Sequence, residues 1–357
     1  MAQSLRENLL ENKPYVDLVL GPDSYRRLPQ ILEQRQQQPD HVVDAKLSRF
    51  EVYEDLFPRR HAGINAWVSI MRGCDKFCTF CIVPFTRGRE RSRSVSNIIE
   101  EVTQAVEEGF PEITMLGQNV NSYRHEDHSF ADLLAGTAAV PGLKRIRYTS
   151  PHPQDINDDV LLTMARHDNI CDYIHLPLQA GADRILRRMN RTYTREYFMR
   201  LVDRIREILP EVGISTDIIV GFPGETDEEF RQTLGVMEYV KFDSAFTFKY
   251  SPRTGTKAAE YGDQVAAEKS QDRLEQLIKL QKEHTLFRNR QMIGKHVTVL
   301  VEKESKRSAE MWAGRTDANK WVIFPKQSAR IKDFVTVEIK AARGVSLHGD
   351  IVSLEQK

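Results

Sequence analysis

The regular alternation of strand-like and helix-like segments between residues 64 and 250 most constrains how this chain can fold. Six apolar runs begin at intervals of 28 to 48 residues: Ile64–Met71, Glu112–Leu116, Arg145–Thr149, Tyr173–Leu176, Gly213–Val220 and Ser244–Tyr250. Such spacing is typical of strand–helix–strand units, whose right-handed crossovers build a parallel sheet. Six units are too few for an eight-fold barrel. The sequence therefore predicts an α/β fold with an incomplete (β/α)6 barrel.

Small, polar and proline residues follow each of these six runs. The segments are Gly73-Cys74, Gly117-Gln118-Asn119, Ser150-Pro151-His152, Pro177-Leu178-Gln179, Gly221-Phe222-Pro223-Gly224-Glu225 and Ser251-Pro252-Arg253. The C-terminal edge of a parallel sheet is where α/β folds build their sites. Turn chemistry explains any one of these segments, but it explains all six less easily.

The segments around the barrel predict three further units. Residues 1–40 have a helix–strand–helix pattern with a single strand at 16–20, which needs neighbours and indicates the C-terminal remnant of an α/β domain. Residues 41–59 form a polar linker before the barrel at 60–286, which ends in a long helix, Ala266–Arg290. Residues 287–357 alternate in short runs and predict a small antiparallel β-barrel.

Composition and charge exclude several classes of protein. The 357 residues are 29% charged, and they contain neither a membrane-spanning run of roughly 18 to 20 apolar residues nor an apolar signal core at Met1–Pro14. We therefore expect a globular, cytoplasmic, monomeric protein without membrane association. The net charge is zero, but residues 286–357 carry 14 Lys and Arg against 8 Asp and Glu. Such a basic end suits a polyanion, although basic surfaces often bind nothing specific.

Three of the four cysteines lie within eight residues, directly after the first barrel strand. Cys74, Cys78 and Cys81 are spaced Cys-x3-Cys-x2-Cys. A four-iron, four-sulfur cluster normally takes four cysteines, so three thiolates leave one iron open to another ligand. Zinc is the rival, with His61, His125 or His152 completing the ligand set. The fourth cysteine, Cys171, precedes an apolar run, where cysteine usually acts as a small core residue.

The cysteine loop and its neighbouring segments carry a resemblance to a known family. The spacing, with Phe80 just before the last cysteine, resembles the radical S-adenosylmethionine (SAM) superfamily. The methylthiotransferase branch is indicated by Arg72–Pro84, Arg87–Arg93, Gly117–Tyr123, Ser150–Pro153 and His175–Gln179. The chain most resembles the tRNA enzymes that add a methylthio group at C2 of N6-isopentenyladenosine beside the anticodon. Sister enzymes act on threonylcarbamoyladenosine in tRNA or on a ribosomal-protein aspartate.

The resemblance implies a radical SAM barrel with a cluster at Cys74, Cys78 and Cys81 as its catalytic centre. The reduced cluster would bind and cleave SAM, with electrons from a flavodoxin or ferredoxin. An unactivated aromatic C–H offers no acidic proton, so the cofactor must supply the reactivity. The implied SAM contacts are Phe80, Gly117, Gln118, Asn119, Ser150, Gln179, Arg191, Val220, Gly221 and Phe222.

Family members also carry a second, auxiliary cluster in a domain that precedes the barrel. Met1–Leu5 resembles the stretch after the last of that domain's three cysteines, and those ligands are absent from this sequence. We therefore expect a truncated chain that cleaves SAM but does not insert sulfur.

The C-terminal segment resembles the TRAM domain, a small tRNA-binding β-barrel. Its expected RNA contacts are Lys303, Lys306, Arg307 and Arg315, with further charge from Lys320, Lys326, Arg330 and Lys332 and possible stacking by Trp312 and Trp321. Arg87, Arg89, Arg91 and Arg93 would hold the anticodon backbone, unless they form a salt-bridged face with Glu90 and the acidic helix beyond. The rival to a tRNA enzyme is a non-catalytic RNA-binding protein with a structural metal.

Overall fold

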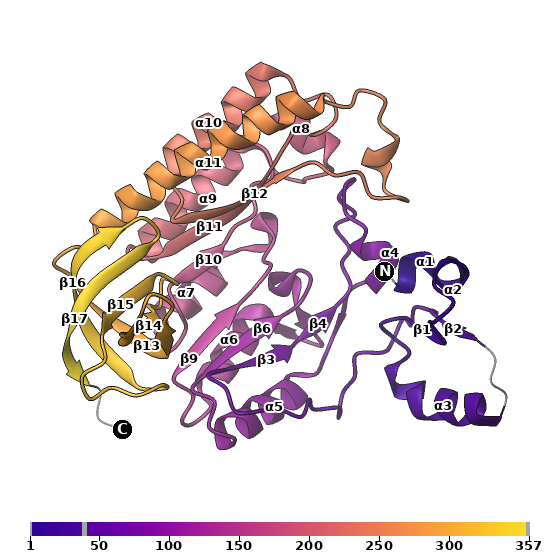
Figure 1. Cartoon of the computed structure of the whole chain (residues 1–357), viewed down its shortest axis with the longest axis horizontal. Helices are drawn as coiled ribbons and strands as arrows, with labels where there is room; N and C mark the ends of the chain where they lie inside the picture. The colour runs from indigo at the N-terminus through magenta and orange to yellow at the C-terminus, as the bar shows by residue number, and fades with distance from the viewer. Residues whose placement is uncertain (1, 38–40, 355–357) are drawn as a thin grey trace.

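Six parallel strands form the centre of the molecule, as predicted. The computed structural model describes residues 2–37 and 41–354. The strands are β3 (Asn65–Ser69), β6 (Glu112–Leu116), β9 (Arg145–Tyr148), β10 (Tyr173–His175), β11 (Gly213–Val220) and β12 (Ser244–Lys249). They pair in the orders β3-β6-β9 and β10-β11-β12, and an isolated bridge between Ile146 and Ile170 lies at the junction. The two sheets form one open, incomplete barrel (Figure 1).

Helices cover the outer side of this barrel (Figure 1). The main ones are α5 (Val95–Glu107), α6 (Phe130–Ala138), α7 (Asp158–Arg166), α9 (Arg195–Ile208), α10 (Asp227–Val240) and α11 (Ala267–Arg290). Side-chain caps fix the starts of the first five, and Ser129 and Thr226 form capping boxes with Asp132 and Glu229. None of the described helices combines the length and the apolar run needed to cross a membrane.

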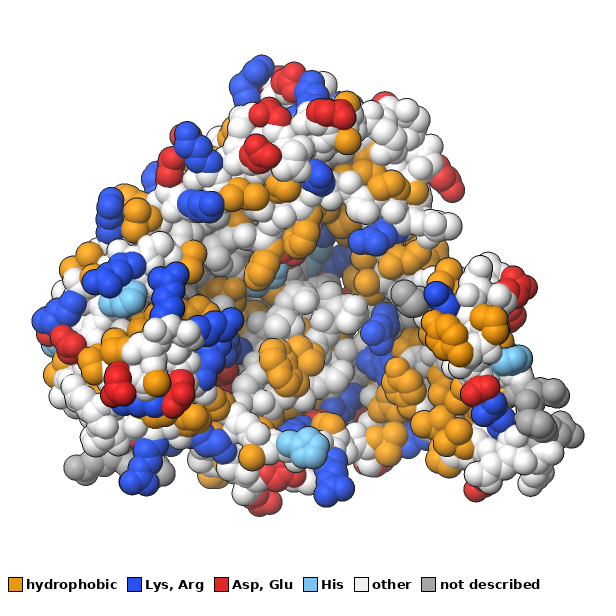
Figure 2. Space-filling view, in the orientation of Figure 1, with side chains coloured by type: hydrophobic (Ala, Val, Ile, Leu, Met, Phe, Trp, Pro, Cys, Tyr) orange, Lys and Arg blue, Asp and Glu red, His pale blue; other side chains and the backbone are white. Residues whose placement is uncertain are grey.

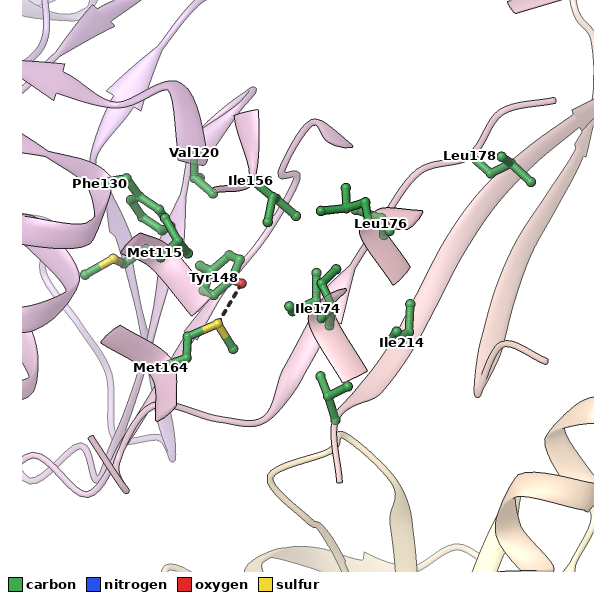
Figure 3. Close-up of a cluster of buried hydrophobic side chains, with 14 of the residues drawn as sticks. Met115, Val120, Phe130, Tyr148, Ile156, Met164, Ile174, Leu176, Leu178 and Ile214 are labelled. Carbon is green, nitrogen blue, oxygen red and sulfur yellow. Dashed lines mark hydrogen bonds between the residues drawn. The ribbon is translucent and has the colours of Figure 1, made fainter. Parts of the chain in front are cut away.

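The main core lies between the strands and these helices. Figure 3 shows Met115, Tyr148 and Ile174 from three strands packed with Phe130 and Met164 from two helices. The Tyr148 hydroxyl contacts Met164 Sδ at 3.2 Å, and its ring packs edge-on against Phe130 at 5.3 Å. These contacts hold the strands in place below the loops at their C-terminal ends.

The N-terminal segment contains a small sheet that the sequence did not reveal. It consists of α1 (Ala2–Leu5), α2 (Glu7–Asn12), β1 (Leu18–Leu20), α3 (Leu28–Gln37) and β2 (Val42–Asp44). Strand β1 pairs in parallel with β2. The expectation of an unpartnered strand was therefore wrong, because the first residues of the predicted linker supply its neighbour. Residues 38–40 of the predicted unit lie outside the described part, and the predicted domain boundaries stay predictions.

The C-terminal segment is a closed five-stranded barrel with the order β13-β14-β15-β17-β16. Its strands are β13 (His296–Ser305), β14 (Ser308–Arg315), β15 (Trp321–Pro325), β16 (Phe334–Arg343) and β17 (Ser346–Leu354). Four of the five were predicted, but β14 was missed. The expectation of a wholly antiparallel barrel was wrong for one pair of strands, since β15 and β17 run parallel.

This small barrel packs beneath the parallel strands, at their N-terminal ends (Figure 1). Arg147 on β9 binds the carboxylate of buried Glu112 at 2.9 Å and the carbonyls of Thr316 and Asp317. Gly213 meets the same connection closely, since a Cβ there would lie 2.5 Å from the Ala318 carbonyl oxygen. The connection between β14 and β15 therefore closes the lower end of the open barrel.

We predict that Arg147→Met lowers the free energy of unfolding by about 3 kcal/mol, because it leaves the buried Glu112 carboxylate with weaker partners. Urea unfolding of the full chain measures this loss. The matched control is Arg200→Met, which removes an exposed pair with Glu196 and should cost about 0.5 kcal/mol or less. Equal, small decreases in the free energy of unfolding of both variants would show that the buried pair does not stabilise the fold.

Candidate functional site

The three-cysteine loop lies at the mouth of the barrel, between β4 (Met71–Arg72) and α4 (Val83–Arg87). Gly73 starts the loop with φ +76°, and a Cβ there would lie 2.0 Å from the Arg89 carbonyl oxygen. Only glycine fits this close approach without a shift of backbone. The Cys74 amide then donates to the Gly88 carbonyl at 3.1 Å. The loop is therefore closed at its base by the returning chain.

Hydrogen bonds join the loop to the other half of the barrel. The Thr79 amide donates to the Met189 carbonyl at 3.0 Å, and its hydroxyl donates to the Arg188 carbonyl at 2.8 Å. The Ala258 amide donates back to the Thr79 carbonyl at 2.9 Å. Because Cys78 and Cys81 flank Thr79, these bonds place both thiols between the two sheets.

The three thiols are partly buried and differ in their neighbours. Arg191 donates to Cys78 Sγ at 3.4 Å. Burial raises the pKa of Cys74 to about 11 and also raises the pKa of Cys81. Bound metal deprotonates a coordinating thiol outright. Partial burial, one loop and a cationic neighbour suit a cluster that must be shielded from water yet reached by a second ligand.

The described residues contain no group of three His, Cys, Asp or Glu side chains placed to hold a single metal ion. Zinc requires its ligands to converge at roughly 2.0 to 2.3 Å from one point. His152, one of the three proposed zinc ligands, instead accepts the Gln154 amide at Nδ1. The three thiols on one loop match the cysteine ligands that iron–sulfur clusters use.

The predicted SAM residues on the first half gather at the ends of β6 and β9. Gly117, Gln118 and Ser150 line an open cavity of about 600 Å³ that also contacts Gly73, the residue before Cys74. Asn119 is buried, donates to Asp155 at 2.8 Å and accepts from the His152 amide at 3.0 Å. Asn119 thus orders the neighbouring loops.

The predicted SAM residues on the second half follow β10 and β11. Gln179 is 8% exposed, and its Oε1 has no hydrogen-bond partner among the described residues. A buried acceptor left unpaired is costly, so this oxygen is a candidate to accept a donor from a bound group. Gly221 donates its amide to Glu225 at 2.7 Å, whereas Val220 and Phe222 are fully buried. Phe222 packs edge-on against Phe80 at 6.5 Å.

Two of the four arginines after the cysteine loop are not available to RNA. Arg91 is buried against Asp23 at 3.1 Å, and Arg93 is buried against Glu101 at 2.5 Å. The expectation that they hold the anticodon backbone is therefore wrong, because breaking such pairs would leave carboxylates buried without a partner. Arg87 and Arg89 are exposed, and Arg89 pairs with Asp75.

The basic side chains of the C-terminal barrel divide into two groups. Lys303, Lys306 and Arg307 line a groove of about 1010 Å³, together with Lys282 and Arg343, which the sequence reasoning missed. A second group contacts acidic or carbonyl groups: Arg315 with Glu112 and Glu302, Lys320 with Asp243, Lys326 with Glu304, and Lys332 with the Gly109 carbonyl. Arg330 belongs to neither group and is exposed. Arg315 therefore joins the two barrels, in disagreement with its predicted RNA contact.

Comparison with known proteins places the chain in a family. Residues 68–237 match the Radical SAM superfamily, and residues 290–352 match the TRAM domain. The tRNA-2-methylthio-N(6)-dimethylallyladenosine synthase of Porphyromonas gingivalis (strain ATCC BAA-308 / W83) is 47% identical over 99% of this chain and 77% of that relative. The chain belongs to this synthase family. The Carboxydothermus hydrogenoformans synthase agrees, with 44% identity over 98% of this chain and 80% of the relative.

A solved structure supports the fold of this synthase-family chain. The cobalamin-dependent S-adenosylmethionine radical enzyme OxsB, with aqua-cobalamin and S-adenosylmethionine bound, superposes with a TM-score of 0.51. The match covers 79% of this chain and 42% of OxsB at 14% sequence identity. Identity this low supports the shared radical SAM fold and nothing finer.

We predict that the stability of the folded protein depends on His152 as the pH falls. Burial and the charges of Arg191 and Lys76 lower the pKa of His152 from 6.5 to about 2. Below pH 6.5 His152 takes up a proton in the unfolded state but not in the folded state. Protonation therefore favours unfolding, and the free energy of unfolding falls as the pH decreases below 6.5. Between roughly pH 6 and pH 4 the parent should lose about 1.4 kcal/mol per pH unit more than His152→Asn.

Urea unfolding of parent and variant at several pH values tests this difference. Asparagine is chosen because its carbonyl can accept the same Gln154 amide but does not titrate. Parallel pH profiles for the two proteins would show that His152 is protonated in the folded state.

Proposed function

We propose that this protein adds a methylthio group at C2 of N6-dimethylallyladenosine in tRNA. The observation that carries the proposal is the 47% identity to a synthase of that name along nearly the whole chain. A second observation supports the proposal: the loop with Cys74, Cys78 and Cys81 is present, and hydrogen bonds hold it across the mouth of the barrel. The proposed cluster is a [4Fe-4S] centre at these thiols with one iron left open to SAM.

When bound, the cluster and SAM supply the electron and the radical chemistry that an unactivated aromatic C–H requires. The chain's own residues position these groups. Arg191 donates to Cys78 Sγ and to the Pro177 carbonyl, so it links one ligand to the loop after β10. Gln179 offers an unpaired buried oxygen that is available to a donor on SAM. Gly117, Gln118 and Ser150 line the open cavity beside the cysteine loop.

The TRAM domain is proposed to hold the tRNA backbone. The supporting observation is the groove lined by Lys303, Lys306 and Arg307 together with Lys282 and Arg343. Phosphate contacts supply affinity that falls with salt, whereas selection of one modified base requires contacts in the barrel. Arg87 and Arg89 stay candidates for further backbone contacts near the cysteine loop.

Several predictions from the sequence stay predictions. These are the auxiliary cluster, the failure of residues 1–357 alone to insert sulfur, the flavodoxin or ferredoxin donor, the monomeric state and the cytoplasmic location. The sister reaction on threonylcarbamoyladenosine is the second candidate, and substrate comparison separates the two.

We predict that Cys78→Ala abolishes SAM cleavage, because it removes one of three iron ligands. After anaerobic reconstitution with iron and sulfide, 5′-deoxyadenosine formation with dithionite and SAM is measured, and bound iron is counted. Cys171→Ala is the matched control, since Cys171 is buried and lies near Asp317, far along the chain from the loop. It should keep both iron and product. Product from Cys78→Ala at the parental rate would contradict the assigned ligand set.

We predict that exchanging Lys306 and Arg307 together for alanine weakens tRNA binding and reduces its salt dependence. Each lost phosphate contact should lower the slope of log affinity against log salt by about 0.7 to 0.9. Fluorescence anisotropy with an anticodon stem-loop over a salt series measures the slope. The control is Arg200→Ala with Arg204→Ala on the outer helix α9. An unchanged slope in the Lys306 and Arg307 variant would exclude this groove as the backbone site.

A further inference from the structure

The inner face of the second sheet exposes large aromatic side chains. In the parallel register Asp217 pairs with Phe246 and Ile219 with Phe248, so all four side chains share one face. Lys249, on the opposite face of β12, donates to Gln271 of α11. The Phe246 and Phe248 face is therefore the one turned away from the helices. Their rings are 56% and 50% exposed.

The edge strand of the other sheet has a similar side chain on its inner face. Trp67 on β3 is 56% exposed, whereas its neighbours Ala66 and Val68 are buried against the helices. Strands β3 and β12 border the opening of the incomplete barrel. Figure 2 shows that this face of the molecule is hollowed at its centre. Exposed aromatic rings in a hollow mark a ligand site, and rings of this kind stack on bases.

A chain of polar groups lies beside Phe246. Tyr173 and Ser215 share a hydrogen bond of 2.5 Å, Ser215 lies 2.8 Å from His175 Nδ1, and His175 Nε2 lies 3.2 Å from Asp217. With Nδ1 accepting from the Ser215 hydroxyl and Nε2 donating to the Asp217 carboxylate, the His175 ring joins these two groups. The His175 ring contacts Phe246 edge-on at 5.9 Å.

The basic side chains deeper in the barrel are already neutralised. Arg147 binds Glu112, Arg145 binds Asp317, and Lys320 binds Asp243. Arg147 shares the inner face of its sheet with Trp67, because Trp67 pairs with Thr114 and Thr114 with Arg147. These three cations are therefore not free to receive a carboxylate on a substrate.

We propose that Phe246 and Phe248 form the wall that receives the N6 substituent of the target adenosine, and that Asp217 excludes anionic substituents from it. The proposal rests on the proposed function and names its selectivity: an apolar, branched substituent is accepted, and the carboxylate of a threonylcarbamoyl group is rejected. Burying an unpaired carboxylate against apolar rings and next to another carboxylate is strongly unfavourable.

The position of this wall agrees with the shape of adenine. C2 and C6 flank N1 in the six-membered ring of adenine, and their outward bonds diverge, so a base with C2 turned toward the cysteine loop directs the N6 substituent away from it. At about 3.3 Å per residue, Asp217 lies about 13 Å along β11 from Gly221, and Ile219 with its partner Phe248 lies about half as far. The substituent would therefore reach Phe248 first and Phe246 next.

The test compares three anticodon stem-loops on the reconstituted protein of residues 1–357: unmodified, dimethylallylated and threonylcarbamoylated. We expect the parent to bind the dimethylallylated RNA most tightly. Phe246→Ala and Phe248→Ala should each lower the preference over unmodified RNA by at least about fivefold, because truncation removes apolar contacts with a substituent that the unmodified base lacks. Asp217→Asn, which keeps an acceptor for His175, should bind the threonylcarbamoylated RNA at least about fivefold more tightly than the parent does.

Tyr239→Ala is the matched control, because Tyr239 is a half-exposed aromatic residue that contacts Asp203 on the outer helices. Its preferences should equal those of the parent. Phe248→Leu keeps apolar volume and should keep most of the preference, which guards against a folding defect in the alanine variants. A selective parent with equally selective Phe246→Ala and Phe248→Ala variants would overturn the wall and leave the proposed function intact. A parent that does not prefer dimethylallylated RNA would overturn both.

Discussion

A barrel made of two three-stranded sheets depends on ties between its halves. The isolated bridge between Ile146 and Ile170 joins them at the junction, and the shared hydrophobic core packs across both halves. The cysteine loop ties the upper ends, through Thr79 to the Met189 and Arg188 carbonyls. The connection between β14 and β15 ties the lower ends, because the Asp317 carbonyl accepts from Arg147 of the first half and Lys320 binds Asp243 of the second. The same loop that carries the iron ligands is therefore part of the scaffold.

This double role explains where chemistry can occur. The tied upper ends bring the glycine-rich and amide-bearing loops after β6, β9, β10 and β11 around one mouth. There the unpaired oxygen of Gln179 and the Arg191 contact with Cys78 coincide with the three thiols. The lower end is closed and ionic, whereas the side between β3 and β12 is open. Exposed aromatic rings are found on those two strands.

Local patterns predicted the elements but not their long-range partners. The six parallel strands and the helix ending at Arg290 follow from apolar runs and helix-forming stretches, and the structure has them within one to three residues at most ends. Strand β2 was missed because three residues in a polar segment carry little period-two signal. Strand β14 was missed because Ser308, Glu310 and Gly314 interrupt its apolar pattern, and pairing with β13 and β15 compensates.

The candidate site shows the same limit. The spacing of Cys74, Cys78 and Cys81 could be interpreted from sequence alone, because loop ligands are close in the chain. The burial of Arg91 and Arg93 could not, because Asp23 and Glu101 are contributed by separate segments. Lys282 and Arg343 were missed for a related reason: each is unremarkable in its own segment, and only the fold brings them to the TRAM groove.

The ionic contacts beneath the barrel also fix the distance between the TRAM domain and the cysteine loop. Arg315, Lys320 and Lys332 bind groups of the larger barrel, which immobilises the TRAM domain relative to the cysteine loop. The proposed phosphate groove and the three thiols are therefore held at a fixed distance from each other. An enzyme with two sites at a fixed distance can select a nucleotide by its distance from the bound RNA phosphates. This selection does not require recognition of the base itself.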